Sequence, residues 1–282
     1  MQTVQEAATL RAMIRSWREQ RQSLAFVPTM GNLHEGHFSL LRRAHNCADR
    51  VVVSIFVNPT QFDSGEDLAH YPRTFEADQV GLSERDCDVL FFPAIETMYP
   101  YGLEQTVRVR VPGLGDTLEG VYRVGHFDGV STVVSKLFNL VQPDYAVFGE
   151  KDWQQLQIVR HLVDDLSLPI EVVAGPTQRE PDGLALSSRN RFLNAQQRAI
   201  APAMYATLCW MRDNYTSGHT RTVVETAARA RLQRVGFELD YIVIRRATDL
   251  TEPEKYIHTG LIGLAAGHLG STRLIDNILF DV

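Results

Sequence analysis

Five short runs of β-branched and aromatic residues occur in the first 176 residues, and none alternates between apolar and polar positions. They are LAFVPT (24–29), RVVVSIFVN (50–58), DVLFFP (88–93), DYAVFG (144–149) and IEVVAG (170–175). An alternating strand exposes one face to water, whereas a continuous apolar run is typical of a strand covered on both faces. We therefore expect a parallel sheet between two layers of helices.

The segments between these runs have apolar residues at helical spacing, near 36–48, 73–87, 127–141 and 152–167. A repeated strand, helix, strand order predicts a Rossmann-like, doubly wound α/β domain. Ligands of such domains bind beyond the carboxyl ends of the strands. Polar clusters that directly follow a strand are therefore candidate binding segments.

The pattern changes after residue 176. Helical patterns near 195–216 and 222–236 precede three strand-like segments, LDYIVIRRA (239–247), GLIGLAAGHL (260–269) and TRLIDNILFDV (272–282). This order predicts a smaller α+β C-terminal domain with an antiparallel sheet. The Pro- and Gly-rich stretch GPTQREPDG (175–183) indicates the boundary, so we expect domains at 1–176 and 177–282.

Composition limits the classes of function. The 282 residues are 44% hydrophobic and 22% charged with a formal net charge of −6, which argues against a broad nucleic-acid-binding surface. No run approaches the roughly 18 apolar residues of a membrane span, and the first 20 residues resemble an amphipathic helix, so we expect a cytoplasmic protein with no membrane partner. Cys47, Cys87 and Cys209 lack CxxC spacing and indicate buried thiols, not disulfides or a zinc site.

The stretch PTMGNLHEGHFSL (28–40) follows the first apolar run and has His34 and His37 three residues apart. A zinc-protease HExxH motif needs its histidines four apart on a helix, so a metal site is disfavoured. A phosphate site explains more of the residues in this stretch. Gly31 and Gly36 allow the backbone to approach a ligand closely, and a following helix directs its positive dipole end at an anion. An ordinary strand-to-helix turn with two solvated histidines is the third interpretation.

This stretch resembles the HxGH signature of the nucleotidyltransferase superfamily and, in its full form, the pantoate-β-alanine ligase family. Three further segments are similar to that family in order and separation: VSIFVNPTQF (53–62), GHFDGVSTVVSKLFNLVQPDYAVFGEKDWQQ (125–155) and GLALSSRN (183–190). Together these motifs cover most of the first 190 residues. Asn32 and Phe38 depart from the family's more frequent residues, but neither change removes a group that the chemistry needs.

The resemblance implies a two-step ligation that uses ATP with Mg²⁺. The carboxylate of (R)-pantoate attacks the α-phosphate and releases pyrophosphate, leaving a bound pantoyl adenylate. The amine of β-alanine then attacks the acyl carbon, so pantothenate forms and AMP leaves. This chemistry requires neutralised charge on the triphosphate and reactants held in line. The family also implies a homodimer.

The resemblance assigns three segments to ATP binding. They comprise Met30, Gly31, Asn32, Leu33, His34, Glu35, Gly36 and His37; Gly149, Glu150, Lys151 and Asp152; and Gln178, Leu186, Ser187, Ser188 and Arg189. His34, His37, Lys151 and Arg189 are the expected catalytic residues. The family assigns His37 as proton donor, but pyrophosphate hardly needs protonation to leave at neutral pH, so we favour a hydrogen-bonding role. The serine pair is also suited to capping a helix.

Four residues are expected near the other substrates by resemblance: Gln61, Gln155, Asn58 and Arg123. Neutral amides can bond a carboxylate and a hydroxyl without trapping the charge that must react. Phe56, Val133 and Val134 are expected to form an apolar wall for the methyl groups of pantoate, although core packing explains them equally well.

A nucleotidyltransferase of the cytidylyl type is the alternative function. It would share the HxGH motif and the sheet but would leave the nucleotide attached to its product, whereas a ligase releases AMP. The sequence contains neither GxGxxG nor GxxxxGK[ST], so a dinucleotide fingerprint and a Walker A loop are both excluded. No protein-only metal cage is apparent, so magnesium is expected to arrive with ATP.

Overall fold

The computed structural model describes residues 1–62, 65–254 and 257–280. The chain folds into two compact units. The first unit is Met1–Glu150 with Ile158–Pro176, and the second unit is Lys151–Gln157 with Thr177–Val282. The last two positions of the strand-like segment 272–282 lie outside the described residues.

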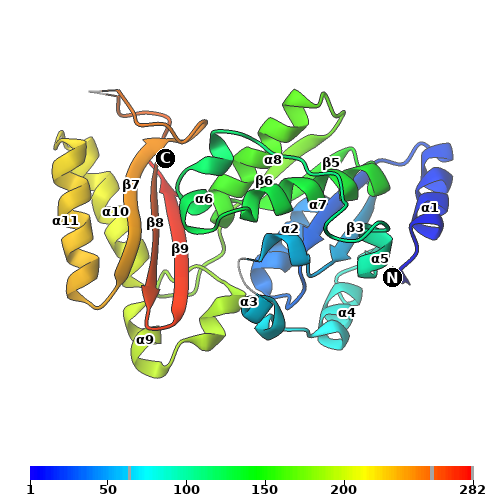
Figure 1. Ribbon diagram of the computed structural model, residues 1–282, viewed down its shortest axis with the longest axis horizontal. Coiled ribbons are helices and arrows are strands. Elements are labelled where there is room, and N and C mark those ends of the chain that lie inside the picture. Colours follow the sequence, from blue (N-terminus) through cyan, green and yellow to red (C-terminus); the bar gives the residue numbers. More distant parts are fainter. Residues whose placement is uncertain (63–64, 255–256, 281–282) are drawn as a thin grey trace. The chain divides into compact units, whose positions relative to one another are not determined.

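A parallel sheet forms the centre of the first unit (Figure 1). Its strand order is β1-β4-β3-β2-β5-β6. Its strands are β1 (Gln2–Val4), β2 (Leu24–Thr29), β3 (Arg50–Ile55), β4 (Val89–Phe91), β5 (Tyr145–Gly149) and β6 (Glu171–Gly175). All five apolar runs are strands, which confirms the predicted Rossmann-like, doubly wound class. The sequence did not reveal β1, because this short edge strand exposes two of its three residues and depends on pairing with β4.

Helices cover both faces of this sheet. The main ones are α1 (Ala7–Glu19), α2 (Glu35–His45), α4 (Phe75–Ser83) and α7 (His126–Val141), and α8 (Trp153–Asp165) begins in the second unit and continues in the first. Leu41 of α2 and Leu82 of α4 share one buried cluster with Val53 of β3. On the other face, Phe138 of α7 meets Phe148 of β5 edge-on, with ring centroids 6.3 Å apart.

Short helices connect these elements. They are η1 (Pro59–Gln61), α3 (Gly65–His70), α5 (Ile95–Met98), η2 (Leu114–Asp116), α6 (Glu119–Tyr122) and η3 (Glu150–Asp152). None of the helices within the described residues combines the length and apolarity that a membrane span requires.

The chain changes direction in the sheet between β2 and β5. From β2 it proceeds outward through β3 and β4, then returns to place β5 and β6 on the other side of β2. Doubly wound sheets bind ligands at such a switch point, beyond the carboxyl ends of the strands. Met30–His37 follows β2 and Gly149 ends β5, so both of these expected ATP segments belong to the switch point.

The second unit contains an antiparallel sheet and a pair of long helices. Its elements are η4 (Ser188–Phe192), α9 (Ala195–Ile200), α10 (Ala203–Thr216), α11 (Arg221–Arg234), β7 (Glu238–Arg246), β8 (Leu261–Leu269) and β9 (Thr272–Leu279). This arrangement confirms the predicted α+β C-terminal part. The single helix expected over 195–216 is wrong, because Pro202 lacks an N–H and separates α9 from α10.

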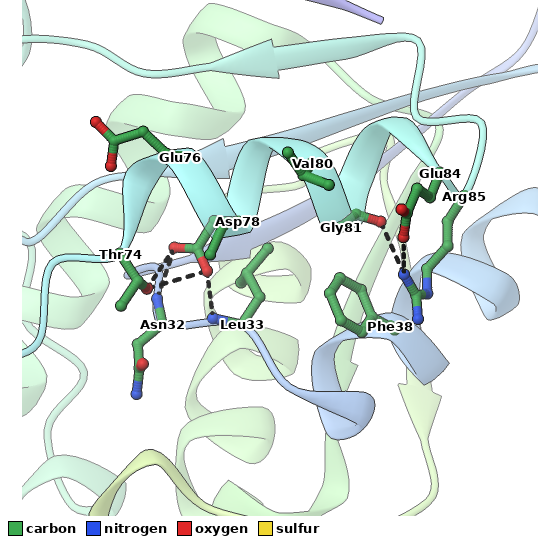
Figure 2. A pocket seen from close by; sticks show the side chains of 11 residues that line it. Asn32, Leu33, Phe38, Thr74, Glu76, Asp78, Val80, Gly81, Glu84 and Arg85 are labelled. Carbon is green, nitrogen blue, oxygen red and sulfur yellow. Dashed lines mark hydrogen bonds and ion pairs between the residues drawn. The ribbon is translucent and has the colours of Figure 1, made fainter.

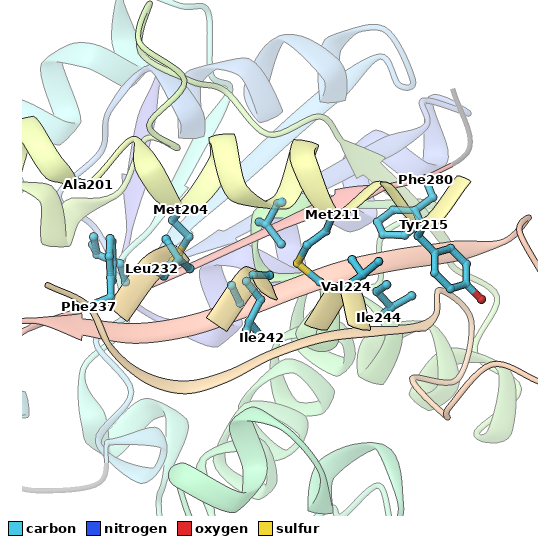
Figure 3. Close-up of a cluster of buried hydrophobic side chains, with 14 of the residues drawn as sticks. Ala201, Met204, Met211, Tyr215, Val224, Leu232, Phe237, Ile242, Ile244 and Phe280 are labelled. Carbon is cyan, nitrogen blue, oxygen red and sulfur yellow. The ribbon is translucent and has the colours of Figure 1, made fainter. Parts of the chain in front are cut away.

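One buried apolar cluster holds the second unit together (Figure 3). Met204, Leu208, Met211 and Tyr215 of α10 and Val224, Ala228 and Leu232 of α11 pack with Ile242 and Ile244 of β7 and with Phe280. Burial of each large side chain stabilises the fold by about 1.5–3 kcal/mol. The η4 helix contacts β9 and therefore packs against a sheet that this cluster stabilises.

The three cysteines are free thiols. Cys87 is buried, and burial raises its pKa to about 12. Cys47 and Cys209 are partly exposed, which corrects the expectation that all three thiols are buried.

Candidate active site

Asp78 of α4 holds the turn between β2 and α2 in shape (Figure 2). Its carboxylate accepts the backbone N–H groups of Asn32 and Leu33, each at 2.8 Å, and the Thr74 hydroxyl lies 3.1 Å from both oxygens. Gly31 and Asn32 adopt left-handed backbone angles, with φ of +84° and +52°. A Cβ on Gly31 would also lie 3.1 Å from Asp78 Oδ2, which is a tight contact, so the backbone conformation and the limited space both favour glycine here.

Sequence reasoning missed Asp78. It lies 41 residues beyond the HxGH turn, counted from His37, and no local pattern connects the two. The signal available was a carboxylate on the face of a helix that packs on the sheet, because a buried charge needs hydrogen-bond partners. Asp78 occupies the backbone N–H groups of Asn32 and Leu33, so these two groups are not available to bind phosphate.

His34 and His37 hold the start of α2 through a reciprocal cap. The Gly36 N–H donates to Nδ1 of His34 at 3.1 Å, and the His34 N–H donates to Nδ1 of His37 at 3.3 Å. A ring nitrogen that accepts an N–H carries no proton, so each neutral imidazole has its proton on Nε2. The two rings are therefore arranged to donate through Nε2, which favours hydrogen bonding to phosphate oxygens.

Asn58, three residues after the end of β3, orients the loop that contains Gln61. Its buried amide Nδ2 donates to Gln61 Oε1 at 2.9 Å and to the Gly129 carbonyl at 3.2 Å. Its Oδ1 accepts from the Tyr99 hydroxyl at 2.6 Å and from the Thr60 hydroxyl at 3.0 Å. Because burial raises the pKa of Tyr99, this phenol stays protonated as a donor. All donors of the amide are used, which fixes its orientation.

Gln61 connects this loop to the HxGH turn. Its side-chain Nε2 donates to Sδ of Met30 at 3.2 Å. Its carbonyl accepts from Nδ1 of His126 at 2.7 Å, and Nε2 of His126 lies 3.0 Å from a terminal nitrogen of Arg123. A guanidinium can only donate, so His126 carries its proton on Nδ1. The expected residues Met30, Gln61, Asn58 and Arg123 thus belong to one hydrogen-bonded group in the first unit.

Gly129 of α7 allows the helix to approach this loop, and sequence reasoning missed it too. A Cβ at this position would overlap the carbonyl oxygen of Thr60. An isolated glycine in a helical pattern was the available signal, since it often indicates a packing reason. Phe56, Val133 and Val134 are buried, and their role as an apolar wall stays a prediction.

Of the remaining expected residues, Glu35, Gly149 and Glu150 belong to the first unit and the others to the second. Lys151 Nζ lies 3.9 Å from Asp152 Oδ1, with side chains 20% and 50% exposed, and Gln155 is partly exposed on α8. The Leu186 N–H donates to the Gln178 carbonyl at 2.9 Å, which closes a hairpin before η4.

Ser187 caps η4. Its hydroxyl accepts the Arg189 N–H at 3.3 Å, so the serine stretch does serve as a helix cap. Ser188 and Arg189 are partly exposed in the first turn of that helix. Among the described residues, the structure contains no group of three or more His, Cys, Asp or Glu side chains suited to hold a metal ion.

The first unit is a doubly wound α/β fold with the HxGH turn at the switch point of its sheet, which places the chain in the class of α/β proteins that bind ligands there. Residues 2–279 match the pantoate-beta-alanine ligase family. The chain belongs to that family, which confirms the resemblance found in its motifs.

Related proteins agree over their whole lengths. The pantothenate synthetase of Xylella fastidiosa (strain M12) is 53% identical over 279 residues, which cover 99% of each chain. That of Xanthomonas euvesicatoria pv. vesicatoria (strain 85-10) is 50% identical over 280 residues, 99% of this chain and 100% of the relative.

Solved structures give the same result. Pantothenate synthetase from Thermus thermophilus superposes with a TM-score of 0.92 at 45% identity, covering 99% of both chains. Pantoate-beta-alanine ligase from Francisella tularensis, solved in complex with beta-gamma ATP and beta-alanine, gives a TM-score of 0.84 at 34% identity and covers 100% of this chain and 98% of the other.

Proposed function

We propose that this protein condenses (R)-pantoate with β-alanine to form pantothenate, with conversion of ATP to AMP and pyrophosphate through a pantoyl adenylate. The observation that carries the proposal is the paired-histidine turn at the switch point, in a chain of this family over residues 2–279. The Francisella tularensis relative, solved with beta-gamma ATP and beta-alanine, supports the same substrates for this chain.

ATP is bound by Met30–His37, Gly149–Asp152, Gln178 and Leu186–Arg189 in this proposal. His34 and His37 donate from Nε2 to phosphate oxygens, and these bonds strengthen as charge develops on the leaving pyrophosphate. Lys151 supplies a compact positive charge, and Arg189 supplies a planar fork that can bind two oxygens at once. The hydroxyls of Ser187 and Ser188 add donors.

(R)-Pantoate is held by Gln61 and Gln155. The hydrogen bond from Asn58 to Gln61 Oε1 supports this role, because it orients the glutamine amide before substrate binds. Arg123 contributes through His126 and the Gln61 carbonyl, which keep the loop in place. Phe56, Val133 and Val134 receive the methyl groups. Alignment of the pantoate carboxylate with the α-phosphate lowers the barrier further, because the two reactants are already held in the geometry of attack.

Magnesium arrives with ATP and neutralises charge on its phosphates. The donor set fits this role, because Mg²⁺ usually keeps several waters and binds one or two carboxylates besides substrate phosphates. Asp152 offers one half-exposed carboxylate next to Lys151. We place the protein in the cytoplasm, where its three free thiols would stay reduced.

We assign ATP and pantoate binding to residues 1–176 and a lid function to residues 177–282, and we propose a homodimer. Five exposed apolar side chains within one stretch of the first unit support an interface: Tyr101, Val107, Val121, Tyr122 and Val124. Light scattering is expected to give twice the 31.8 kDa chain mass. A monomer at micromolar concentration contradicts the dimer but leaves the reaction untouched.

Product analysis tests the reaction. With ATP, Mg²⁺ and (R)-pantoate alone, we expect one equivalent of pyrophosphate per active site, because the adenylate stays bound. Addition of β-alanine is expected to start steady release of AMP and pantothenate. Nucleotide that remains attached to a released product would instead indicate a cytidylyl-type transferase, and the absence of both products would overturn the proposed substrates.

A further inference from the structure

Asp276 and Asn277 are neighbours on β9, so their side chains point to opposite faces of the antiparallel sheet. They are 5% and 6% exposed, and both lie within the second unit. Polar side chains buried to this degree need specific partners. The partner of Asn277 is Lys151, in a segment that the proposed function assigns to ATP binding. The partner of Asp276 is Arg179, which adjoins another such segment at Gln178.

Asp276 anchors the hairpin that leads to Ser187–Arg189. Its carboxylate accepts two hydrogen bonds from the Arg179 guanidinium, at 2.7 and 2.9 Å. Arg179 pairs with Ala185 across the hairpin and also donates to the Gly183 carbonyl at 3.1 Å. Its guanidinium lies 3.7 Å from the ring centroid of Tyr205. This planar, bidentate geometry holds the base of the hairpin in one position relative to β9.

Asn277 anchors the segment that contains Lys151. Its side-chain Nδ2 donates to the Lys151 carbonyl at 2.9 Å. Two residues later, the Trp153 indole donates to the Ala247 carbonyl at 2.8 Å, which makes a second attachment of the same segment. The backbone from which the lysine side chain extends is therefore held by the second unit.

The two anchors are directly connected. Arg179 donates to the Asn277 carbonyl at 3.2 Å, and the Asn277 N–H donates to Asp276 Oδ1 at 2.8 Å. Lys151 and the hairpin before η4 are far apart in the sequence, yet both are bonded to this one dipeptide.

We propose that Asn277 is a positioning residue for Lys151, and that with Asp276 it holds Lys151 and the Ser187–Arg189 segment in one fixed arrangement toward the phosphates of ATP. The proposal rests on the proposed function, which assigns those phosphates to Lys151. A lysine has a flexible four-carbon stem, so the position of its ammonium depends on where its backbone is held. Misplacement of a catalytic group by about 1 Å can reduce the rate about 100-fold.

The test is a double-mutant cycle between Asn277 and Lys151. Asn277→Asp keeps the shape but offers no donor to the Lys151 carbonyl, and Asn277→Leu removes the donor without adding charge. Either change is expected to lower kcat/KM for ATP by about 10-fold to 100-fold, with KM for β-alanine unchanged. In the Lys151→Ala background the same change is expected to cost less than about twofold, because the group that Asn277 positions is already absent.

Asn214→Asp is the matched control. Asn214 also donates from Nδ2 to a backbone carbonyl at 2.8 Å, that of Trp210 within α10. It is assigned no role in the proposed site, so we expect wild-type kinetic constants with a similar change in melting temperature. Two results would show a general structural effect and overturn the proposal. One is an equal loss of kcat/KM in this control. The other is an equal loss of kcat/KM from Asn277→Asp in the wild type and in the Lys151→Ala background.

Two further arms keep the outcomes distinct. If the wild type forms no AMP from pantoate, the proposed function fails. The same double-mutant cycle is then measured by calorimetry as the affinity for ATP with Mg²⁺. Non-additive losses of affinity support the positioning role, and additive losses overturn it. If both Asn277 variants fail to fold, Arg179→Lys carries the test, because an ammonium cannot make the bidentate bond to Asp276. The loss of kcat/KM caused by Arg179→Lys is then expected to be non-additive with the loss caused by Arg189→Ala. Additive losses overturn the proposal.

Discussion

The imidazole rings of His34 and His37 lie with their centroids 4.2 Å apart, and each ring accepts a backbone N–H of its own turn through Nδ1. This relationship determines which nitrogen of each ring carries the proton. Any hydrogen bond that either neutral ring donates to a ligand must come from Nε2. The turn therefore presents two donors without a positive charge on either ring.

Replacement of His37 by asparagine or by glutamine separates the roles of its two nitrogens. In H37N the amide oxygen would lie near the position of Nδ1 and so preserve the cap, whereas in H37Q the longer side chain would offer an N–H near the position of Nε2. If His37 stabilises charge by donation, H37N should lower the rate by about 100-fold to 1,000-fold, and H37Q should be about tenfold faster than H37N. The rate of pyrophosphate release at saturating (R)-pantoate measures this difference. Equal, complete loss in both variants would instead indicate that His37 transfers a proton.

Asp78→Asn should disturb the HxGH turn. An amide oxygen can accept one of the N–H groups of Asn32 and Leu33, but its NH₂ group would face the other. We expect the free energy of unfolding to fall by about 1–3 kcal/mol, as for an unsatisfied buried donor, and KM for ATP to rise. Urea denaturation and steady-state kinetics measure the two effects. Glu76→Gln is the control, because Glu76 is an exposed carboxylate in the same first turn of α4.

Gly129→Ala should displace the loop that contains Gln61. The new methyl group would overlap the Thr60 carbonyl, so either α7 or the loop must move. Overpacking of this kind costs about 1–3 kcal/mol. We expect KM for (R)-pantoate to rise severalfold while KM for ATP changes less. Gly115→Ala is the control, since its Cβ would lie 3.6 Å from Phe127 Cβ, an ordinary contact. Unchanged pantoate kinetics in G129A would argue against a substrate role for this loop.

Cys87 should resist alkylation in the folded protein. Burial raises its pKa to about 12 from 9.0, so at pH 8 the thiol is protonated and inaccessible. A group whose pKa is raised on folding contributes stability that is present below its unfolded pKa and is lost as pH rises toward the folded value. Mass spectrometry after iodoacetamide treatment at pH 8 should show modification of Cys47 and Cys209, with Cys87 modified only after denaturation. Rapid native labelling of Cys87 would contradict its burial.

Several features of the fold could be predicted from local sequence patterns. The strand at 24–29 and the other apolar runs were evident because a parallel strand buried on both faces must be apolar along its length. The paired histidines could be placed beyond the end of a strand, because they follow the apolar run at 24–29. The edge strand at residues 2–4 and the helix break at Pro202 were missed, since the first depends on pairing with β4 and the second was hidden within a continuous helical pattern.

Motifs also sufficed to recognise the family, because the chemistry of the ligation requires particular side chains at particular places in the chain. What the motifs could not provide was the set of residues that hold those side chains in place. The local pattern around Asp78, Gly129 and Asn277 does not identify the partner of any of them, since each contacts backbone that is distant in the sequence.

The sequence by itself thus determined the class of fold, the family and the segments in which the candidate reacting groups occur, because these depend on periodicity and on residue type. The tertiary structure alone decided the proton position on His34 and His37, the occupation of the turn's N–H groups by Asp78, and the attachment of Lys151 to β9. The physical reason is that a hydrogen bond depends on distance and direction between two groups, and chain folding sets both.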